Sequence, residues 1–295
     1  MKKLNKGIIL ASTLSLSLVL TACNEKTEGN KEDKQSEDKK HTQHNQQNDK
    51  EQPKQDNKTN EKSANDISQN KKLALAFFAD DADMYTLTKD EALTGIFESD
   101  AQGKKEKKQL YKLLLIKEKS VANAPEDMDF YTVYPPKGSF ASIVGVSKDK
   151  VLVSGTQATL DYKELKETGE EYNVKDLYEK NKNYSSLDEL ANKIKITDKN
   201  PMQDDKTREE YEANESPSTN THMRTQVFQM IADFDGKIDT DKYLVDNVKL
   251  DKNGKWYVNY RNKNAEIVGT YTTMGKDIVK KDAEGKVIKK EAVKD

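Results

Sequence analysis

The chain has 295 residues, of which 35% are charged and 34% hydrophobic, and its formal net charge is −2. Because basic and acidic residues nearly balance, the chain lacks the basic excess that attracts nucleic acid, and we expect no nucleic-acid partner. Its single cysteine, Cys23, excludes an internal disulfide, so this thiol needs another explanation.

The first 22 residues show the three zones of a secretory signal. Three lysines without an acidic residue precede an apolar stretch from Gly7 to Leu20. This stretch has 14 residues, whereas a helix needs about 20 to cross the hydrocarbon core of a membrane. It ends in Leu20-Thr21-Ala22-Cys23, an aliphatic residue followed by small residues and the cysteine. The pattern predicts a signal peptide over residues 1–22.

The tetrapeptide Leu20-Thr21-Ala22-Cys23 resembles the lipobox of bacterial lipoproteins. The resemblance implies cleavage by signal peptidase between Ala22 and Cys23 and a diacylglyceryl thioether on Cys23, with or without a further N-acyl chain. Two acyl chains hold a protein firmly at a membrane, whereas one chain binds only marginally. We therefore expect a lipid-anchored protein at the extracytoplasmic face of the cell membrane. The alternative is an ordinary secretory signal in which the cysteine is a coincidence.

Residues 23–70 are expected to form the lipidated cysteine and a disordered polar tether. Between residues 24 and 70 only Ala64 and Ile67 are apolar, so this stretch buries too little to offset its conformational entropy. The lipobox, the long polar tether and the Lys-rich composition make the chain similar to surface lipoproteins of Gram-positive bacteria. That similarity implies a location in the cell and carries no activity with it.

Residues 71–196 are predicted to form an α+β domain. Thr88 and Glu91 have the spacing of a capping box that opens a helix, and Ser186 with Glu189 repeats it. Residues 107–120 fit a helix or a strand, and the flanking turns favour a strand. Asp100–Gly103 is expected to be a turn. The other expected elements are strands at 130–134, 140–146 and 151–162 and helices at 174–180 and 186–196.

The polar stretch 197–220 is the expected linker to a second α+β domain, residues 221–295. Apolar residues at helical spacing between Met223 and Phe234 predict one helix, which Gly236 ends. Runs of strand-forming residues separated by Gly and Asn turns predict an antiparallel meander, with strands at 243–250, 256–260, 266–272, 277–281 and 286–290. The sequence thus predicts an α+β protein of two small domains with antiparallel sheets, after a signal peptide and a disordered tether.

Two aspartate-rich turns resemble the middle of a calcium-binding EF-hand loop. Their glycines, Gly236 and Gly254, would stand at loop position 6. Position 12, where a glutamate should bind calcium with both oxygens, is then Lys242 or Tyr260. We therefore expect no metal site, and the sequence shows no cofactor motif either. The alternatives that stay open are irregular aspartate clusters at 80–83 and 233–241.

Catalytic patterns are incomplete in this sequence. Beyond the tether, His222 is the one histidine that could act as a general base, and Ser216 or Ser218 could be the nucleophile of a Ser–His pair. No G-x-S-x-G turn accompanies this pair, and the zinc-protease, dinucleotide and P-loop motifs are absent. We therefore expect no catalytic residues and no enzyme activity.

The densest group of aromatic and proline side chains predicts a recognition patch. Its expected members are Tyr131, Tyr134, Pro135, Pro136 and Phe140. The first functional hypothesis is a non-enzymatic lipoprotein whose domains bind a protein or cell-wall component of the envelope. One alternative is the solute-binding lipoprotein of an importer, a class that usually has two lobes with parallel sheets. Another is an envelope hydrolase, which the missing motifs disfavour.

Overall fold

The computed structural model describes residues 67–101, 103–110, 112–201, 203–206, 208–209, 217–251, 253 and 255–293. These residues belong to one compact unit, residues 58–295, which contains both predicted domains. The predicted signal peptide, its cleavage site, Cys23 and the tether up to residue 66 lie outside the described residues. Within the described ranges, no helix is long and apolar enough to cross a membrane. The fold is α+β, as predicted, with sheets that are mostly antiparallel.

The first large sheet has six strands in the order β7-β6-β5-β4-β3-β8. Its strands are β3 (Leu114–Lys117), β4 (Asp129–Tyr134), β5 (Ala141–Val146), β6 (Lys150–Thr156), β7 (Glu170–Asn173) and β8 (Lys195–Thr197). β3 and β8 are parallel, and the other neighbours are antiparallel. Alternation along β4 sends Tyr131 and Val133 to one face of the sheet and Phe130 to the other. The strands predicted at 130–134 and 140–146 are confirmed.

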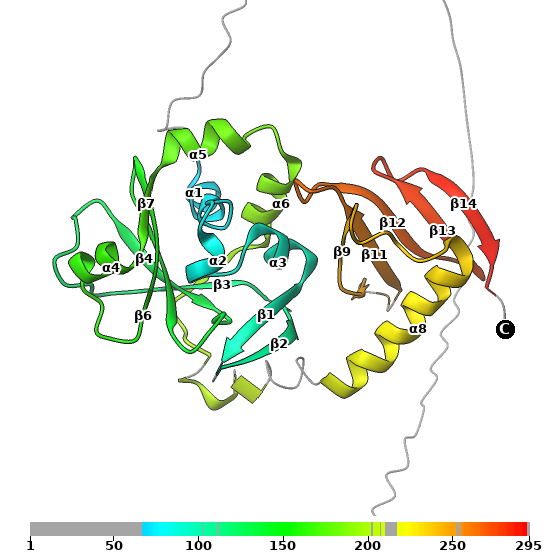
Figure 1. Cartoon of the computed structure of the whole chain (residues 1–295), viewed down its shortest axis with the longest axis horizontal. Helices are drawn as coiled ribbons and strands as arrows, with labels where there is room; N and C mark the ends of the chain where they lie inside the picture. The colour runs from blue at the N-terminus through cyan, green and yellow to red at the C-terminus, as the bar shows by residue number, and fades with distance from the viewer. Residues whose placement is uncertain are drawn as a thin grey trace, which may run out of the picture. The chain divides into compact units, whose positions relative to one another are not determined.

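The N-terminal half of the fold is residues 67–197. Its larger core lies between the six-stranded sheet and a layer of helices (Figure 1). The helices are α1 (Gln69–Ala76), α2 (Ala82–Tyr85), α3 (Lys89–Thr94), α5 (Val174–Asn181) and α6 (Ser185–Lys193). On the opposite face a smaller core is covered by α4 (Tyr162–Thr168) through Leu165. The capping box predicted at Thr88 and Glu91 is confirmed at the start of α3.

Two boundaries in this half differ from the prediction. Ile67 is 6% exposed and belongs to the core, and the Ser68 hydroxyl caps α1, so residues 67–70 are part of the fold rather than the tether. The strand predicted at 151–162 is too long, since β6 ends at Thr156 and α4 begins at Tyr162. The Asp161 carboxylate caps α4 by accepting hydrogen bonds from the backbone N–H groups of Lys163 and Glu164.

β1 (Ile96–Ala101) and β2 (Lys104–Gln109) form a separate two-stranded antiparallel sheet. Their turn lies at the predicted position, and Gly103 adopts a φ of +70° there, a conformation that favours glycine. In the segment 107–120, β2 includes residues 107–109 and β3 includes residues 114–117. The preference for strand over helix there is confirmed.

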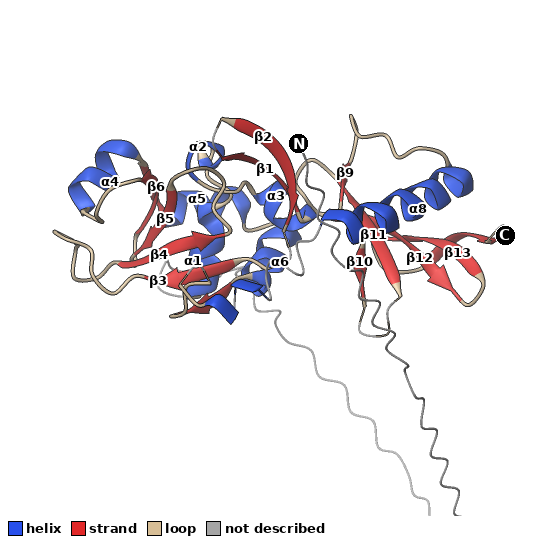
Figure 2. Cartoon of the chain, turned by 90° about the horizontal axis from the view of Figure 1, so that it is seen from below, coloured by secondary structure: helices blue, strands red, loops and turns tan. Residues whose placement is uncertain are grey.

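The C-terminal half is a helix on an antiparallel meander, as predicted (Figure 2). α8 spans Pro217–Asp235, and Gly236 ends it with a φ of +81°. The strands are β9 (Leu244–Val245), β10 (Lys249–Leu250), β11 (Trp256–Arg261), β12 (Ile267–Met274), β13 (Asp277–Asp282) and β14 (Val287–Ala292). They follow the order β10-β11-β12-β13-β14, with β9 also paired to β11. Val227, Ile231 and Phe234 of α8 pack against β11, β12 and β13.

The strand predicted at 243–250 is broken in two by Asp246 and Asn247. Both side chains are buried, and the Asp246 carboxylate is bound by Arg261 inside the protein. The predicted linker is also shorter than expected. β8 extends to residue 197 and α8 begins at residue 217, so both ends of the stretch 197–220 belong to regular elements.

The β11–β12 loop joins the two halves at the start of α6. The Glu266 carboxylate accepts a hydrogen bond from the backbone N–H of Ser185 at 3.1 Å, and the Ser186 hydroxyl donates to the Asn264 carbonyl oxygen at 2.8 Å. Ala265 of this loop is fully buried in the core of the first half. The capping box predicted at Ser186 is therefore wrong, since the cap of α6 comes from Glu266 in the other half of the chain.

Candidate ligand-binding site

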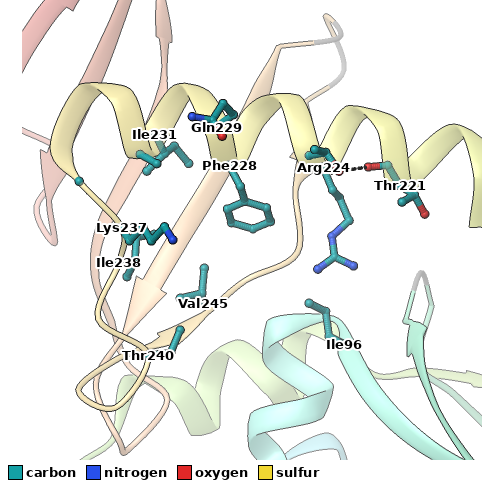
Figure 3. A pocket seen from close by; sticks show the side chains of 13 residues that line it. Ile96, Thr221, Arg224, Phe228, Gln229, Ile231, Lys237, Ile238, Thr240 and Val245 are labelled. Atoms are coloured by element: carbon teal, nitrogen blue, oxygen red, sulfur yellow. Dashed lines mark hydrogen bonds between the residues drawn. The ribbon is translucent and has the colours of Figure 1, made fainter.

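The main candidate site is a cavity of about 590 Å³ beside α8. α8 forms one wall, the segment after Gly236 forms the opposite wall, and single residues of β1 and β9 complete the lining (Figure 3). A cavity of this size lies within the range of small-molecule sites, roughly 300–1,000 Å³. The lining residues are Ile96, Thr221, Arg224, Thr225, Phe228, Gln229, Ile231, Ala232, Gly236, Lys237, Ile238, Thr240 and Val245.

Helix periodicity and one turn explain how this cavity forms. Residues three and four apart on α8 share a face, so Arg224, Phe228 and Ala232 lie in a row along the wall. The left-handed backbone at Gly236 reverses the chain and brings the following segment back alongside the helix. The Asp239 carboxylate then accepts hydrogen bonds from the backbone N–H groups of residues 241 and 242, at 3.0 and 3.2 Å, which holds this return segment in a turn.

The lining combines apolar side chains with two cations. Figure 3 shows the Phe228 ring and the Arg224 side chain both extending from α8 into the cavity, with Lys237 on the facing segment. The Arg224 guanidinium lies 5.8 Å from the centre of the Phe228 ring, within the range of a cation–π contact. Among the described residues that line the cavity there is no aspartate and no glutamate. The described lining is therefore largely apolar and carries two basic side chains.

The same lining lacks the parts of a catalytic centre. Among its described residues there is no histidine, cysteine or carboxylate that could serve as nucleophile or base. The Thr225 hydroxyl donates to the Thr221 carbonyl oxygen at 2.9 Å, as threonines on helices commonly do.

The structure gives no support to a catalytic pair of His222 with Ser216 or Ser218. His222 does not begin α8 but lies within its first two turns, with its side chain exposed. Ser216 lies outside the described residues, and of Ser218 only the backbone is described.

The five residues predicted as a recognition patch do not form one surface. Tyr134, Pro136 and Phe140 line a cavity of about 330 Å³ on one face of the sheet. Tyr131 is 1% exposed and faces the helices, where its hydroxyl accepts a hydrogen bond from Gln69 at 2.6 Å. Pro135 is buried as well. Alternation along β4 separates Tyr131 from Tyr134, which the sequence treats as one aromatic group.

Five of the seven aspartates in the clusters at 80–83 and 233–241 accept hydrogen bonds from protein donors: Asp80, Asp81, Asp233, Asp235 and Asp239. Asp80 pairs with Lys180 at 2.7 Å, and Asp81 accepts a hydrogen bond from the Tyr172 hydroxyl. Asp235 accepts from Tyr271, Lys280 and Lys289 at 2.7–2.9 Å. Among the described residues, no group of three or more metal-binding side chains is arranged to hold an ion.

A buried charge network joins the two halves and was not predicted. The Arg261 side chain is 0% exposed, and its Nε donates to Asp246 at 2.6 Å. Its two terminal nitrogens bind the Glu189 carboxylate of α6. Lys249 and Asn259 also donate to Asp246, at 2.8 and 3.0 Å. Burial alone would lower the pKa of Arg261, but the hydrogen bonds to its two carboxylates raise it above the ordinary value.

Lys193 lies at the edge of this network and donates to the Ala92 carbonyl oxygen. Burial lowers the pKa of Lys193 to about 8, and the nearby positive charge of Lys249 acts in the same direction. A lysine with such a pKa can mark a functional site. Here it contacts a backbone carbonyl between packed helices, and we interpret it as part of the joint between the halves.

Comparison with known proteins found no family model, no curated protein and no solved structure that matches this chain. The fold and the cavity beside α8 are therefore the basis on which a function is inferred. They define an α+β protein with a cavity of about 590 Å³ beside α8.

Proposed function

We propose that this chain is a lipoprotein anchored through Cys23 at the extracytoplasmic face of the cell membrane, and that its folded part acts by binding rather than by catalysis. The lipobox-like Leu20-Thr21-Ala22-Cys23 supports the anchor. The observation that carries the binding role is the cavity beside α8, with its apolar lining and without a catalytic set among the described residues. The partner is an envelope component that reaches this cavity.

The anchor is tested by replacing Cys23 with alanine in cells. The thiol is the group that takes the lipid, so the Cys23→Ala protein should leave the membrane fraction or accumulate unprocessed. Glu25→Ala is the matched control and should stay in the membrane. A Cys23→Ala protein that is fully processed and still remains in the membrane would contradict the anchor.

The binding role is tested with Nile red, an uncharged dye that fluoresces in apolar surroundings. We expect the full chain carrying Cys23→Ala to bind the dye. Adding Ala232→Phe should weaken binding at least tenfold, because the ring fills space in the cavity. Ala158→Phe places the same ring on an exposed turn and should leave binding unchanged. Equal dye binding by both variants would show that the cavity is not a binding site.

A second candidate is the solute-binding lipoprotein of an importer, which the size of the cavity also supports. That class usually has two lobes with parallel sheets. In the described sheets only β3 and β8 are parallel neighbours, so the fold favours the first proposal. A polar solute that co-purifies with the protein, identified by mass spectrometry, would favour the importer.

A further inference from the structure

We infer that the outer edge of β2 binds an acidic peptide segment of a partner protein, which extends the β1–β2 hairpin as an antiparallel third strand. This surface is separate from the cavity beside α8, since Ile96, at the base of β1, is the one described residue of the hairpin that lines the cavity. The inference therefore goes beyond the ligand-binding role proposed above and is tested independently of it.

β2 is the exposed strand of this hairpin. β1 packs against the first half of the fold, where Phe97 and Ser99 are buried. The outer side of β1 is also occupied, because the backbone N–H of Asp100 donates to the Lys137 carbonyl oxygen at 3.0 Å. β2 is instead exposed from residue 104 to residue 108, and in the described part of the chain it pairs with β1 alone (Figure 2). The open edge of this two-stranded sheet therefore belongs to β2.

The hydrogen-bond pattern shows which backbone groups of β2 face this open edge. The backbone N–H of Leu110 donates to the Gly95 carbonyl oxygen at 2.9 Å, so these two residues form a hydrogen-bonded pair across the hairpin. Such pairs alternate with non-hydrogen-bonded pairs along an antiparallel ladder. The register pairs Lys105 with Asp100 at a non-hydrogen-bonded position, and Lys107 has the same phase. The N–H and C=O groups of Lys105 and Lys107 therefore point to the open edge, where an added antiparallel strand would bind them.

The side chains of the same strand favour an acidic partner. Between residues 104 and 108, β2 has four lysines and one glutamate, so its net charge there is +3. Lys105 pairs with Glu98 of β1 at 2.9 Å. Three lysines form no ion pair with any of the described residues: Lys104, Lys107 and Lys108. Opposite charges at facing positions of two strands attract, so acidic residues on an added strand would pair with these lysines while its backbone bonds to the edge.

Two other occupants fit this edge less well. In a second copy of the chain, antiparallel pairing centred on Glu106 would set each lysine of β2 against a lysine of the other copy, and like charges at facing positions destabilise a strand pair. An anionic membrane surface would attract the lysines but offers no strand to the backbone groups of Lys105 and Lys107. Lysines on an edge strand also prevent unwanted pairing. That protection repels basic strands and leaves an acidic strand as the matching partner.

The experiment measures the fluorescence anisotropy of labelled peptides mixed with the full chain carrying Cys23→Ala. The probe is the peptide VTEEKEETV, whose central lysine faces Glu106 and whose glutamates face the four lysines of β2. One control peptide, VTKKEKKTV, reverses every charge. The other control keeps the probe sequence but carries N-methyl groups on the two glutamates beside the central lysine, which removes their backbone donors. The probe should bind at least tenfold more tightly than either control.

Variants of the protein locate the binding surface. Lys107→Glu places an acid at one of the unpaired positions and should weaken binding of the probe at least tenfold, and Lys108→Glu repeats the test on the other face of β2. Lys163→Glu, on the exposed face of α4, makes the same change in total charge and should leave binding unchanged. Because all three lysines are exposed, the urea unfolding midpoint should be the same in every variant.

Each contrary result overturns the inference for a different reason. Equal binding of the probe and its N-methylated form would show attraction by charge alone, as an anionic membrane or polymer requires. Equal binding of the charge-reversed peptide would exclude selection for acidic residues, and equal binding by Lys107→Glu and Lys108→Glu would place the peptide elsewhere. If no peptide binds, the lysines only protect the edge. None of these results alters the dye-binding test of the cavity.

Discussion

The Arg261 guanidinium and the Glu189 carboxylate form a two-point ion pair, with Nη1–Oε2 and Nη2–Oε1 distances both 2.7 Å. Arg261 ends β11 and Glu189 lies on α6, so the pair connects the two halves of the chain. Nε and Nη2 of the guanidinium also donate to Asp246, which is fully buried. One arginine thus neutralises a buried carboxylate and fixes a helix to a sheet.

Replacing Arg261 with leucine should destabilise the protein by about 3–5 kcal/mol, because it removes the buried cation that pairs with both Asp246 and Glu189. Lys249 and Asn259 would then be the remaining donors to the Asp246 carboxylate. Urea unfolding of the wild type and the variant measures the difference. Lys105→Gln removes a cation whose pair with Glu98 is exposed, and it should leave the unfolding midpoint unchanged. A loss below about 1 kcal/mol in Arg261→Leu would show that the network adds little to stability.

The same network shows why a local sequence pattern can fail to predict a helix cap. Thr88 with Glu91 and Ser186 with Glu189 have identical spacing, yet only the first pair forms a capping box. In the first pair, Thr88 and Glu91 bond to each other's backbone, so the spacing in the sequence is enough to predict the cap. Glu189 is instead bound by Arg261, 72 residues away, a relationship that no local pattern contains. The α8 helix and the meander were predictable for the opposite reason, since their periodicity and turns are local.

The cavity beside α8 was not predicted, although its helix was. Ile96 and Val245 reach it from distant parts of the chain, and tertiary packing alone brings them together. Arg224 and Lys237 are two of 50 basic residues, so nothing in the sequence distinguishes them. The five residues of the predicted aromatic patch do not form one surface, for a simpler reason. Adjacent aromatic residues of a strand face opposite sides of its sheet, and a cluster in sequence becomes two clusters in space.

Stability should rise with pH between about 8 and 10 because of Lys193. Burial lowers its pKa to about 8 in the folded protein, whereas the unfolded chain keeps the ordinary value near 10.5. In that window the unfolded chain binds the proton more tightly, so the free energy of unfolding increases as the proton is lost, by roughly 1–2 kcal/mol. Above pH 10 buried tyrosines oppose this trend, since burial raises the pKa of Tyr131 to about 12.

Lys193→Met provides the comparison for this window. The variant has no proton to lose at this position, so its unfolding free energy should not rise between pH 7.5 and pH 9.5, as measured by urea unfolding. A wild-type curve that is flat over the same range, or a variant curve that rises equally, would contradict the assignment to Lys193.

Asp235 should make the protein sensitive to acid. Burial alone would raise the pKa of Asp235, but hydrogen bonds from Lys280, Lys289 and Tyr271 lower it to about 2. The folded state therefore holds this proton less tightly than the unfolded chain. The resulting stability is complete above the ordinary aspartate pKa of 3.8 and is lost as the pH falls towards 2.

Asp235→Asn removes this acid-sensitive contribution. The variant should be less stable than the wild type at pH 6, by roughly 1–2 kcal/mol, and the difference should shrink between pH 4 and pH 2.5. Thermal unfolding of both proteins at a series of pH values measures it. Asp251→Asn alters an exposed turn and serves as the control. A difference that stays constant down to pH 2.5 would assign the loss of stability to packing instead of charge.

Calcium should leave the stability of the protein unchanged, although its aspartate-rich turns lie at the protein surface. In the 233–241 segment, Asp233 accepts a hydrogen bond from Gln229 at 2.8 Å, and Asp239 holds the turn through backbone N–H groups. Asp235 is bound by Lys280, whose positive charge opposes a cation at the same carboxylate. Calcium needs six to eight oxygen ligands around one point, and these carboxylates are directed to separate donors.

The measurement is the melting temperature of the full chain carrying Cys23→Ala, with a chelator and then with millimolar calcium. A ligand that binds only the folded state stabilises it by RT ln(1 + [L]/Kd), about 2.7 kcal/mol at a hundredfold excess over Kd. Such binding would raise the melting temperature by several degrees. Asp235→Asn separates the two explanations of any rise: if the rise persists in the variant, calcium binds elsewhere, and if it disappears, the 233–241 segment rearranges to hold the ion. An unchanged melting temperature with the chelator and with calcium is the expected result, because protein donors already engage Asp233, Asp235 and Asp239.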